Sequence, residues 1–317
     1  MRRSADFPGR RFFNGGNKMS KIVFTGIMPA LLTPFDRDGR IMHGAVKQLV
    51  DWHLSCGVQG FYVCGGTGEG VVLSKQQRME MLECAIDAVA GRGKVIAHTG
   101  AINPNDAFEL TKHATKAGAD GVSSVPPDFY YSYTPREMID FYTRLAGCTD
   151  LPLIAYATNK TGGLDICGIA SALIKVENIV GVKDTRSNYF EMWKLKQING
   201  GDINVINGPD ESLICGLTMG ADGGIGTTYN IMPEKFVEIY RRFRAGDLKG
   251  ALAMQTEVNR IISVLIKHAH GSALRTVKCS LAMSGIDVGL PAYPAGDLTA
   301  DEKAAFKAAM IEAGYRY

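Results

Sequence analysis

The stretch LPLIAYATNKTGGLDICGIASALIKVENIVGVKDT, residues 151–185, decides the fold. It holds two short apolar runs, LIAYA at 153–157 and IVGVK at 179–183, and the segment between them is long enough for a helix. Parallel strands must be joined by a crossover of about this length, which is usually helical. The stretch therefore predicts a strand, a crossover helix and a second strand parallel to the first.

The same alternation recurs along most of the chain. Its eight strand candidates are residues 26–32, 60–64, 95–99, 121–125, 153–157, 179–183, 204–207 and 223–227. Between them lie amphipathic segments, for which Ser74 and Asn103 are expected N-caps. Eight units favour a closed barrel over an open sheet, and no G-x-G-x-x-G fingerprint follows the first strand. The predicted fold class is α/β, a (β/α)8 TIM barrel.

After about residue 247 the strand pattern stops and helical patterns follow, at 254–269, 274–285 and 300–314. We predict a disordered or extra N-terminal tail at 1–20, a catalytic barrel at 21–246 and a C-terminal helical extension at 247–317. The first twenty residues are basic but lack the apolar run of a secretory signal, so a cytoplasmic protein is expected.

Composition excludes several classes of function. A net charge of +3 on 317 residues is too small to indicate a nucleic-acid or membrane partner, although it suits small anionic substrates. The seven cysteines are scattered and never spaced C-x-x-C, which is typical of reduced thiols in the cytosol. No H-E-x-x-H motif or His cluster is present, so no metal site is expected.

Catalytic residues of such barrels lie where strands end and loops begin. Lys183 ends the run IVGVK, and a period of two would place it on the side of Ile179 and Gly181, facing the barrel interior. Desolvation there favours the free amine that carbonyl condensation requires. The alternative is that Lys183 merely pairs with Asp184 at the rim. The strand ends supply the following further candidates: Thr67, Glu69, Tyr130, Tyr131, Tyr156, Thr185, Asp210, Glu211, Thr227 and Thr228.

Some of these residues have alternative interpretations. Tyr156, on the strand next to Lys183, could exchange protons near the amine, or it could be an ordinary aromatic of a barrel layer. The turn GGTGEG, residues 65–70, could bind an anion through backbone N–H groups and the Thr67 hydroxyl, or it could simply be tight. We expect His98 to be a structural histidine and Cys64 a small core residue.

Together these residues resemble the dihydrodipicolinate synthase and N-acetylneuraminate lyase family of pyruvate-dependent class I aldolases. The most specific matches are GGTGEG at 65–70, FYY at 129–131, Tyr156 and GVKDT at 181–185. The set in this order is a far stronger indication than any of its members. The resemblance extends from about Ile22 to the final helices.

The resemblance implies a role for each matched residue. Lys183 would form the Schiff base with pyruvate, with Tyr156 as the proton shuttle and no other cofactor. Thr67, with the backbone of Gly66, would hold the pyruvate carboxylate, and Thr185 would line the same site. Glu69 would support the loop, and Tyr131, or alternatively Tyr130, would reach into the site of a neighbouring subunit. Members of the family are commonly homotetramers built as a dimer of dimers.

The C-terminal half is most similar to the lyase pattern, through GPDES at 208–212 and GADGGIGTTYNIMP at 220–233. By this resemblance Gly208, Asp210, Glu211 and Thr227 would contact the polyol part of the substrate, since carboxylates accept hydrogen bonds from hydroxyls. The implied reaction is retro-aldol cleavage of N-acetylneuraminate, or a similar sialic-acid-like 2-oxo sugar acid, to pyruvate and an amino sugar.

Departures from the family pattern keep other activities open. Gly66 replaces the usual serine or threonine, as in relatives that act on 2-keto-3-deoxy sugar acids, which suggests an aldolase or dehydratase of such acids. Asn159 lies in a segment one residue shorter than usual, and Lys160 falls near an arginine of the synthase, which condenses pyruvate with aspartate semialdehyde. An oxo-acid-binding protein without turnover is the alternative from a different class.

Overall fold

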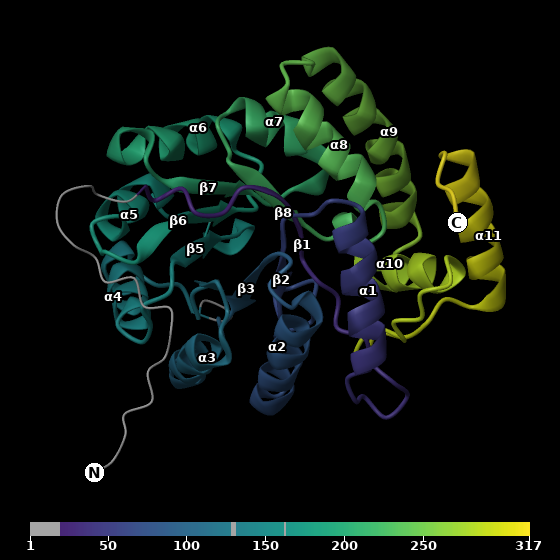
Figure 1. The fold of residues 1–317 in the computed structure, drawn as a ribbon, viewed down its shortest axis with the longest axis horizontal. Coiled ribbons are helices and arrows are strands. Elements are labelled where there is room, and N and C mark those ends of the chain that lie inside the picture. The colour runs from purple at the N-terminus through teal and green to yellow at the C-terminus, as the bar shows by residue number, and fades with distance from the viewer. Residues whose placement is uncertain (1–19, 128–130, 162) are drawn as a thin grey trace, which may run out of the picture.

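The computed structural model describes residues 20–127, 131–161 and 163–317, so the predicted tail lies almost wholly outside the described part. Within these residues strands and helices alternate (Figure 1). The strands are β1 Gly26–Pro29, β2 Gly60–Val63, β3 Lys94–His98, β4 Gly121–Ser124, β5 Leu153–Ala157, β6 Ile179–Asp184, β7 Asn204–Asn207 and β8 Gly223–Gly226. The helices that alternate with them are α1 His43–Ser55, α2 Lys75–Val89, α3 Pro104–Ala117, α4 Pro135–Ala146, α5 Ile166–Leu173, α6 Tyr189–Gln197, α7 Leu213–Thr218 and α8 Pro233–Arg244.

The strands form one parallel sheet that closes on itself. Their order is β1-β8-β7-β6-β5-β4-β3-β2. Closure comes from a parallel bridge between Ala30 and Tyr62, where the Leu31 N–H donates to the Tyr62 carbonyl at 2.9 Å. The predicted TIM barrel is confirmed, and each predicted strand lies within a few residues of an observed one.

Both expected N-caps are present. The Ser74 side chain accepts from the Gln77 N–H, and Gln77 completes a capping box at the start of α2. Asn103 accepts from the Asn105 N–H at the start of α3. These caps fix where the chain turns from a strand-end loop into a helix.

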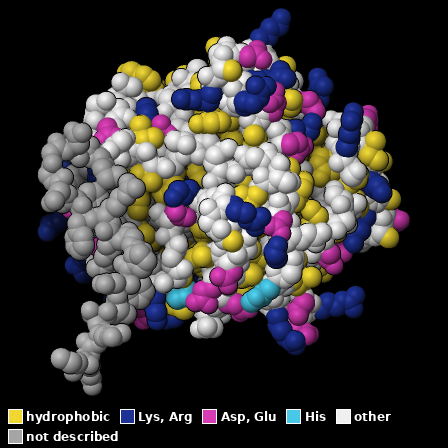
Figure 2. Space-filling view, in the orientation of Figure 1, with side chains coloured by type: hydrophobic (Ala, Val, Ile, Leu, Met, Phe, Trp, Pro, Cys, Tyr) yellow, Lys and Arg dark blue, Asp and Glu magenta, His cyan; other side chains and the backbone are white. Residues whose placement is uncertain are grey.

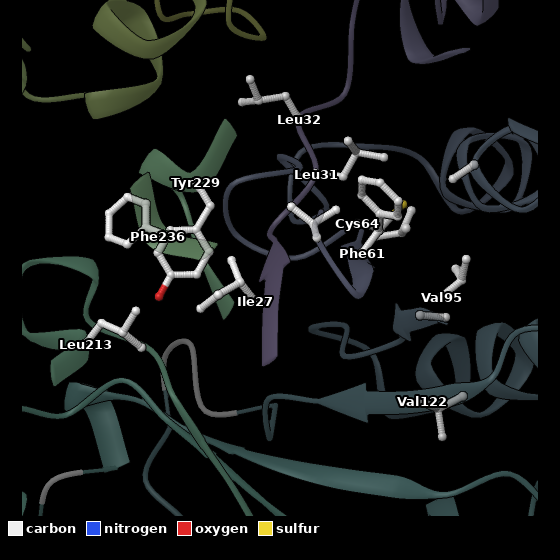
Figure 3. Close-up of a cluster of buried hydrophobic side chains, with 14 of the residues drawn as sticks. Ile27, Leu31, Leu32, Phe61, Cys64, Val95, Val122, Leu213, Tyr229 and Phe236 are labelled. Carbon is white, nitrogen blue, oxygen red and sulfur yellow. The ribbon is translucent and has the colours of Figure 1, made fainter. Parts of the chain in front are cut away.

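The core has an inner and an outer layer. Inside the barrel lie Phe24, Met28, Tyr62, Ile96, Ile154, Val180, Ile206 and Ile225. The outer layer lies between strands and helices, and its buried side chains include Ile27, Leu31, Phe61, Cys64, Val95 and Val122 (Figure 3). Tyr229 and Phe236 extend this layer, with ring centroids 4.1 Å apart. Adjacent residues such as Ile27 and Met28 thus face opposite sides, as the pleat requires.

Strand β6 departs from simple alternation, and the expectation that Lys183 shares a side with Ile179 is wrong. Ile179 belongs to the outer layer and Val180 to the inner one. The register explains this, because Leu153 pairs with Ile179 while the next residue, Ile154, pairs with Gly181. This irregularity adds one residue to β6, as in a β-bulge, and it returns Lys183 to the interior.

Helices α9 Leu248–Lys267, α10 Ala273–Met283 and α11 Ala300–Glu312 follow the barrel and lie to one side of it (Figure 1). Helix α9 packs on α8, and α10 and α11 pack on α9. Basic and acidic side chains are interspersed on the face shown in Figure 2. Among the described residues, none of the helices combines the length and the apolar composition that a membrane span requires.

Candidate active site

Lys183 lies buried at the carboxyl end of β6, with 4% of its surface exposed. Its Nζ is 3.7 Å from the centroid of the Tyr156 ring and 5.2 Å from that of Tyr62. The Nζ also donates to the Thr185 hydroxyl at 3.3 Å. The amine is thus held between two aromatic rings of the barrel interior and one hydroxyl at its mouth.

Asp184 does not neutralise this amine. Its carboxylate is fully buried and binds Arg186, with Nε to Oδ1 at 2.9 Å and Nη2 to Oδ2 at 2.8 Å. No salt bridge to Lys183 is present among the described residues, which excludes the alternative in which Lys183 pairs with Asp184.

Tyr156 stands opposite Lys183 in the β5–β6 register. Its ring is held edge-on by Tyr62, with centroids 6.2 Å apart, and by His98, with centroids 6.1 Å apart. Burial raises the pKa of the Tyr156 hydroxyl, but the charge of Lys183 and hydrogen bonds with Lys183 and Thr185 outweigh it. The net pKa lies below the usual tyrosine value, which suits a group that both donates and accepts a proton.

The glycine turn after β2 brings Thr67 to the same mouth. The Thr67 and Thr227 hydroxyls are 2.6 Å apart, which joins the β2 loop to the β8 loop. Gly70 is required by packing, because a Cβ there would lie 2.0 Å from the Cys64 carbonyl oxygen. Gly66 is different, since it is exposed and no atom lies within 4 Å of its missing Cβ. Its backbone is open to a ligand.

Asp210 and Glu211 follow β7 but have different surroundings. Asp210 is buried, and its Oδ2 accepts from the Thr228 N–H at 2.6 Å and the Thr228 hydroxyl at 2.7 Å. Burial raises the pKa of Asp210 to about 6, with Thr228 opposing the shift. Glu211 is exposed. Asp210 therefore joins two loops of the mouth, a contact that sequence reasoning missed.

Two other predicted residues occupy different places. Gly208 packs on Thr185, because a Cβ at Gly208 would lie 2.2 Å from the Thr185 hydroxyl oxygen. Tyr131 is 74% exposed in the single chain, and no contact with Lys183 is found for it among the described residues. Tyr130 lies outside the described residues.

His98 and Cys64 have the structural roles expected of them. His98 Nδ1 lies 3.1 Å from the Cys64 carbonyl, and its Nε2 accepts from the Val125 N–H at 3.2 Å. Burial lowers the pKa of His98 to about 3, so the ring stays neutral. Burial raises the pKa of the Cys64 thiol to about 11, which makes it a poor nucleophile at neutral pH.

Arg78 on α2 was not predicted, and it braces this region. Its guanidinium donates to the Gly100 carbonyl at 2.8 Å and to the His98 carbonyl at 2.6 Å. The described residues contain no group of three or more His, Cys, Asp or Glu side chains that could hold a metal ion.

Comparison with known proteins gives the family. A model of the Dihydrodipicolinate synthetase family matches residues 23–313. The chain belongs to this family. It is 38% identical over 270 residues to an N-acetylneuraminate lyase of Rhizobium meliloti (strain 1021), covering 85% of this chain and 87% of that relative.

Solved structures with a similar fold match this chain over more than nine tenths of its length. An N-acetylneuraminate lyase of Proteus mirabilis has a TM-score of 0.85 at 29% identity, covering 95% of this chain and 100% of that one. A dihydrodipicolinate synthase of Bacillus anthracis has a TM-score of 0.84 at 28% identity, covering 92% and 98%. Backbone similarity therefore does not separate lyase from synthase, because specificity lies in the loops.

Members of the Dihydrodipicolinate synthetase family are pyruvate-dependent class I aldolases. The protein is accordingly an enzyme, a carbon-carbon lyase of the pyruvate-dependent class I aldolase type.

The raised pKa of Asp210 predicts a pH-dependent effect of Asp210→Asn. A carboxyl whose folded pKa is raised to about 6 contributes stability below about pH 4, and this contribution is lost as the pH rises through 6. The free energy of unfolding of Asp210→Asn, minus that of the wild type, should therefore increase between pH 4 and pH 7 by an amount on the order of 2 kcal/mol. Urea unfolding at both pH values measures the difference, and a pH-independent difference would contradict the shift.

Proposed function

We propose that the protein cleaves N-acetylneuraminate, or a similar sialic-acid-like 2-oxo sugar acid, to pyruvate and an amino sugar. The observation that carries the proposal is the buried Lys183 amine, 3.7 Å from the Tyr156 ring centroid, with no salt bridge among the described residues. The 38% identity to a named N-acetylneuraminate lyase supports the choice of substrate.

The reaction begins with attack of Lys183 Nζ on the C2 carbonyl of the open-chain sugar acid. The resulting carbinolamine loses its hydroxyl as water, and Tyr156 supplies the proton for this departure. An iminium ion on Lys183 is left, and Tyr156 is left as a phenolate. The lowered pKa of Tyr156 favours this exchange.

Cleavage then uses the same two residues. The Tyr156 phenolate takes the proton of the C4 hydroxyl, directly or through the substrate carboxylate, and C4 becomes the aldehyde carbon of the amino sugar. The electron pair of the C3–C4 bond moves to the iminium, which becomes an enamine. Protonation of C3 and addition of water then release pyruvate and restore the amine of Lys183. No further cofactor takes part in these steps.

The substrate carboxylate is proposed to bind at the glycine turn. Thr67 offers its hydroxyl, which Thr227 keeps in place at 2.6 Å, and Gly66 leaves its backbone open to an anion. Thr185 lies on the other side of the amine, where its hydroxyl accepts from Lys183.

The sugar chain is proposed to extend toward the loops after β7 and β8. Asp210, oriented by Thr228, and the exposed Glu211 would accept hydrogen bonds from its hydroxyls. Gly208 and Thr227 would line the remaining side. Two carboxylates suit a neutral polyol better than a second anionic group, which argues against an aldehyde that carries its own carboxylate.

Two alternative activities have some support. The open space at Gly66 suits an aldolase or dehydratase of 2-keto-3-deoxy sugar acids. Lys160, exposed after β5, could neutralise the carboxylate of aspartate semialdehyde in a dihydrodipicolinate synthase, although a lysine cannot make the bidentate contact of an arginine.

We also propose an oligomeric state, domain bounds and a cellular location for the enzyme. The exposure of Tyr131 suits a residue that enters a neighbouring subunit's site, as expected in a homotetramer built as a dimer of dimers. The barrel would comprise residues 21–246 and the extension residues 247–317. A cytoplasmic enzyme without a metal or an organic cofactor is proposed.

Pyruvate release from N-acetylneuraminate is the direct test. Coupling to lactate dehydrogenase should show turnover by the wild type, and Lys183→Met should lower kcat by about 10⁴-fold or more. Release only from 2-keto-3-deoxy sugar acids, or consumption of pyruvate only with aspartate semialdehyde, would contradict the proposal in favour of those activities. Borohydride trapping of pyruvate without any turnover would indicate a binding protein.

Tyr156→Phe keeps the ring beside Lys183 and removes only the hydroxyl. It should lower kcat by about 10²-fold to 10⁴-fold, because proton transfer is lost while the amine remains. Tyr62→Phe is the matched control, since the Tyr62 hydroxyl donates to Ser123 at 3.0 Å and has no proposed proton to transfer. An unchanged kcat in Tyr156→Phe would show that Tyr156 acts by packing alone, and equal losses in the two variants would show that the loss is not specific to the Tyr156 hydroxyl.

A further inference from the structure

A buried ion pair joins the glycine turn to the C-terminal extension. Lys278 of α10 lies with its Nζ 2.7 Å from Oε1 of Glu69, and the two side chains are 1% and 5% exposed. Neither residue contacts the Lys183 amine in any hydrogen bond or salt bridge of the described residues, so the pair stands outside the reacting centre.

Lys278 has two hydrogen-bond partners in addition to the ion pair. Besides Glu69, its Nζ donates to the Thr33 carbonyl at 2.8 Å and to the Leu290 carbonyl at 2.9 Å. Oε2 of Glu69 accepts from the Ala292 N–H at 2.6 Å. The pair therefore ties the glycine turn both to the loop after β1 and to the segment that follows α10.

The glycine turn has an unusual backbone conformation where it meets this ion pair. Glu69 has a positive φ of 58°, which is uncommon for a residue other than glycine. The neighbouring Gly68 carbonyl accepts from the Thr33 hydroxyl at 2.7 Å. Two residues earlier, Gly66 has no side chain to pack, and nothing lies within 4 Å of its missing Cβ. The backbone open to an anion is therefore placed by contacts on the Glu69 side of the turn.

We propose that Lys278 is a positioning residue for the substrate carboxylate, acting through Glu69 on the backbone of Gly66 and the hydroxyl of Thr67. The inference rests on the proposed function, in which this turn holds that carboxylate. Removing Lys278 leaves the Glu69 carboxylate buried without a counter-ion, which strongly favours movement of the turn toward water. The extension would then be part of the binding site without touching the substrate.

The experiment compares Lys278→Met with Lys196→Met. Lys196 of α6 also forms an ion pair, which is partly buried, 2.8 Å from Asp222, but Asp222 precedes β8 at the opposite end of the barrel. The readout is the pyruvate concentration that gives half-maximal borohydride inactivation. We expect it to increase about tenfold or more in Lys278→Met, whereas Lys196→Met should stay within about twofold of the wild type although it too leaves a carboxylate without its counter-ion.

The double variant Glu69→Gln/Lys278→Met separates positioning from stability. It removes both buried charges, so its melting temperature should recover while the half-saturating pyruvate concentration remains raised. If Lys278→Met does not fold, the half-saturating pyruvate concentration is measured in the double variant instead. An unchanged pyruvate concentration in Lys278→Met, or one that recovers together with stability in the double variant, would overturn the inference. A wild type that traps no pyruvate would instead overturn the proposed function on which it rests.

Discussion

The candidate active site depends most directly on the pairing of β5 with β6, which places Tyr156 opposite Lys183. A lysine amine inside a barrel needs contacts that hold it without neutralising it. The Tyr156 and Tyr62 rings supply these contacts, while Arg186 takes the adjacent Asp184 carboxylate away from the amine. The result is an amine and a phenol side by side, the two groups that the proposed function uses as nucleophile and proton carrier.

Much of this arrangement could be predicted from the sequence, because short apolar runs mark strands and their ends mark the catalytic mouth. This reasoning selects Lys183, Tyr156 and Thr67 as candidates. The irregularity at Val180 could not be predicted, since an extra apolar residue does not interrupt an apolar run. The contact of Asp210 with Thr228 was missed for another reason, because hydrogen bonds between loops leave no local pattern.

Prediction from the sequence is limited in the helices as well. Periodicity places the buried faces of helices, but Arg78 is a charged residue on the buried face of α2, and only the carbonyls of Gly100 and His98 explain its place. Glu69 could be assigned to loop support by resemblance, whereas its partner Lys278 lies in the extension and carries no recognisable motif. Long-range polar partners therefore required the structure, and they are the contacts that shape the mouth of the barrel.

Reduction of the enzyme with borohydride in the presence of pyruvate, followed by peptide mass spectrometry, tests the central claim most directly. A Schiff base on Lys183 predicts one reduced pyruvate adduct, located on the peptide that contains Lys183, with loss of activity in proportion to labelling. An adduct on another lysine, or full activity after exhaustive treatment with no adduct on Lys183, would contradict the account.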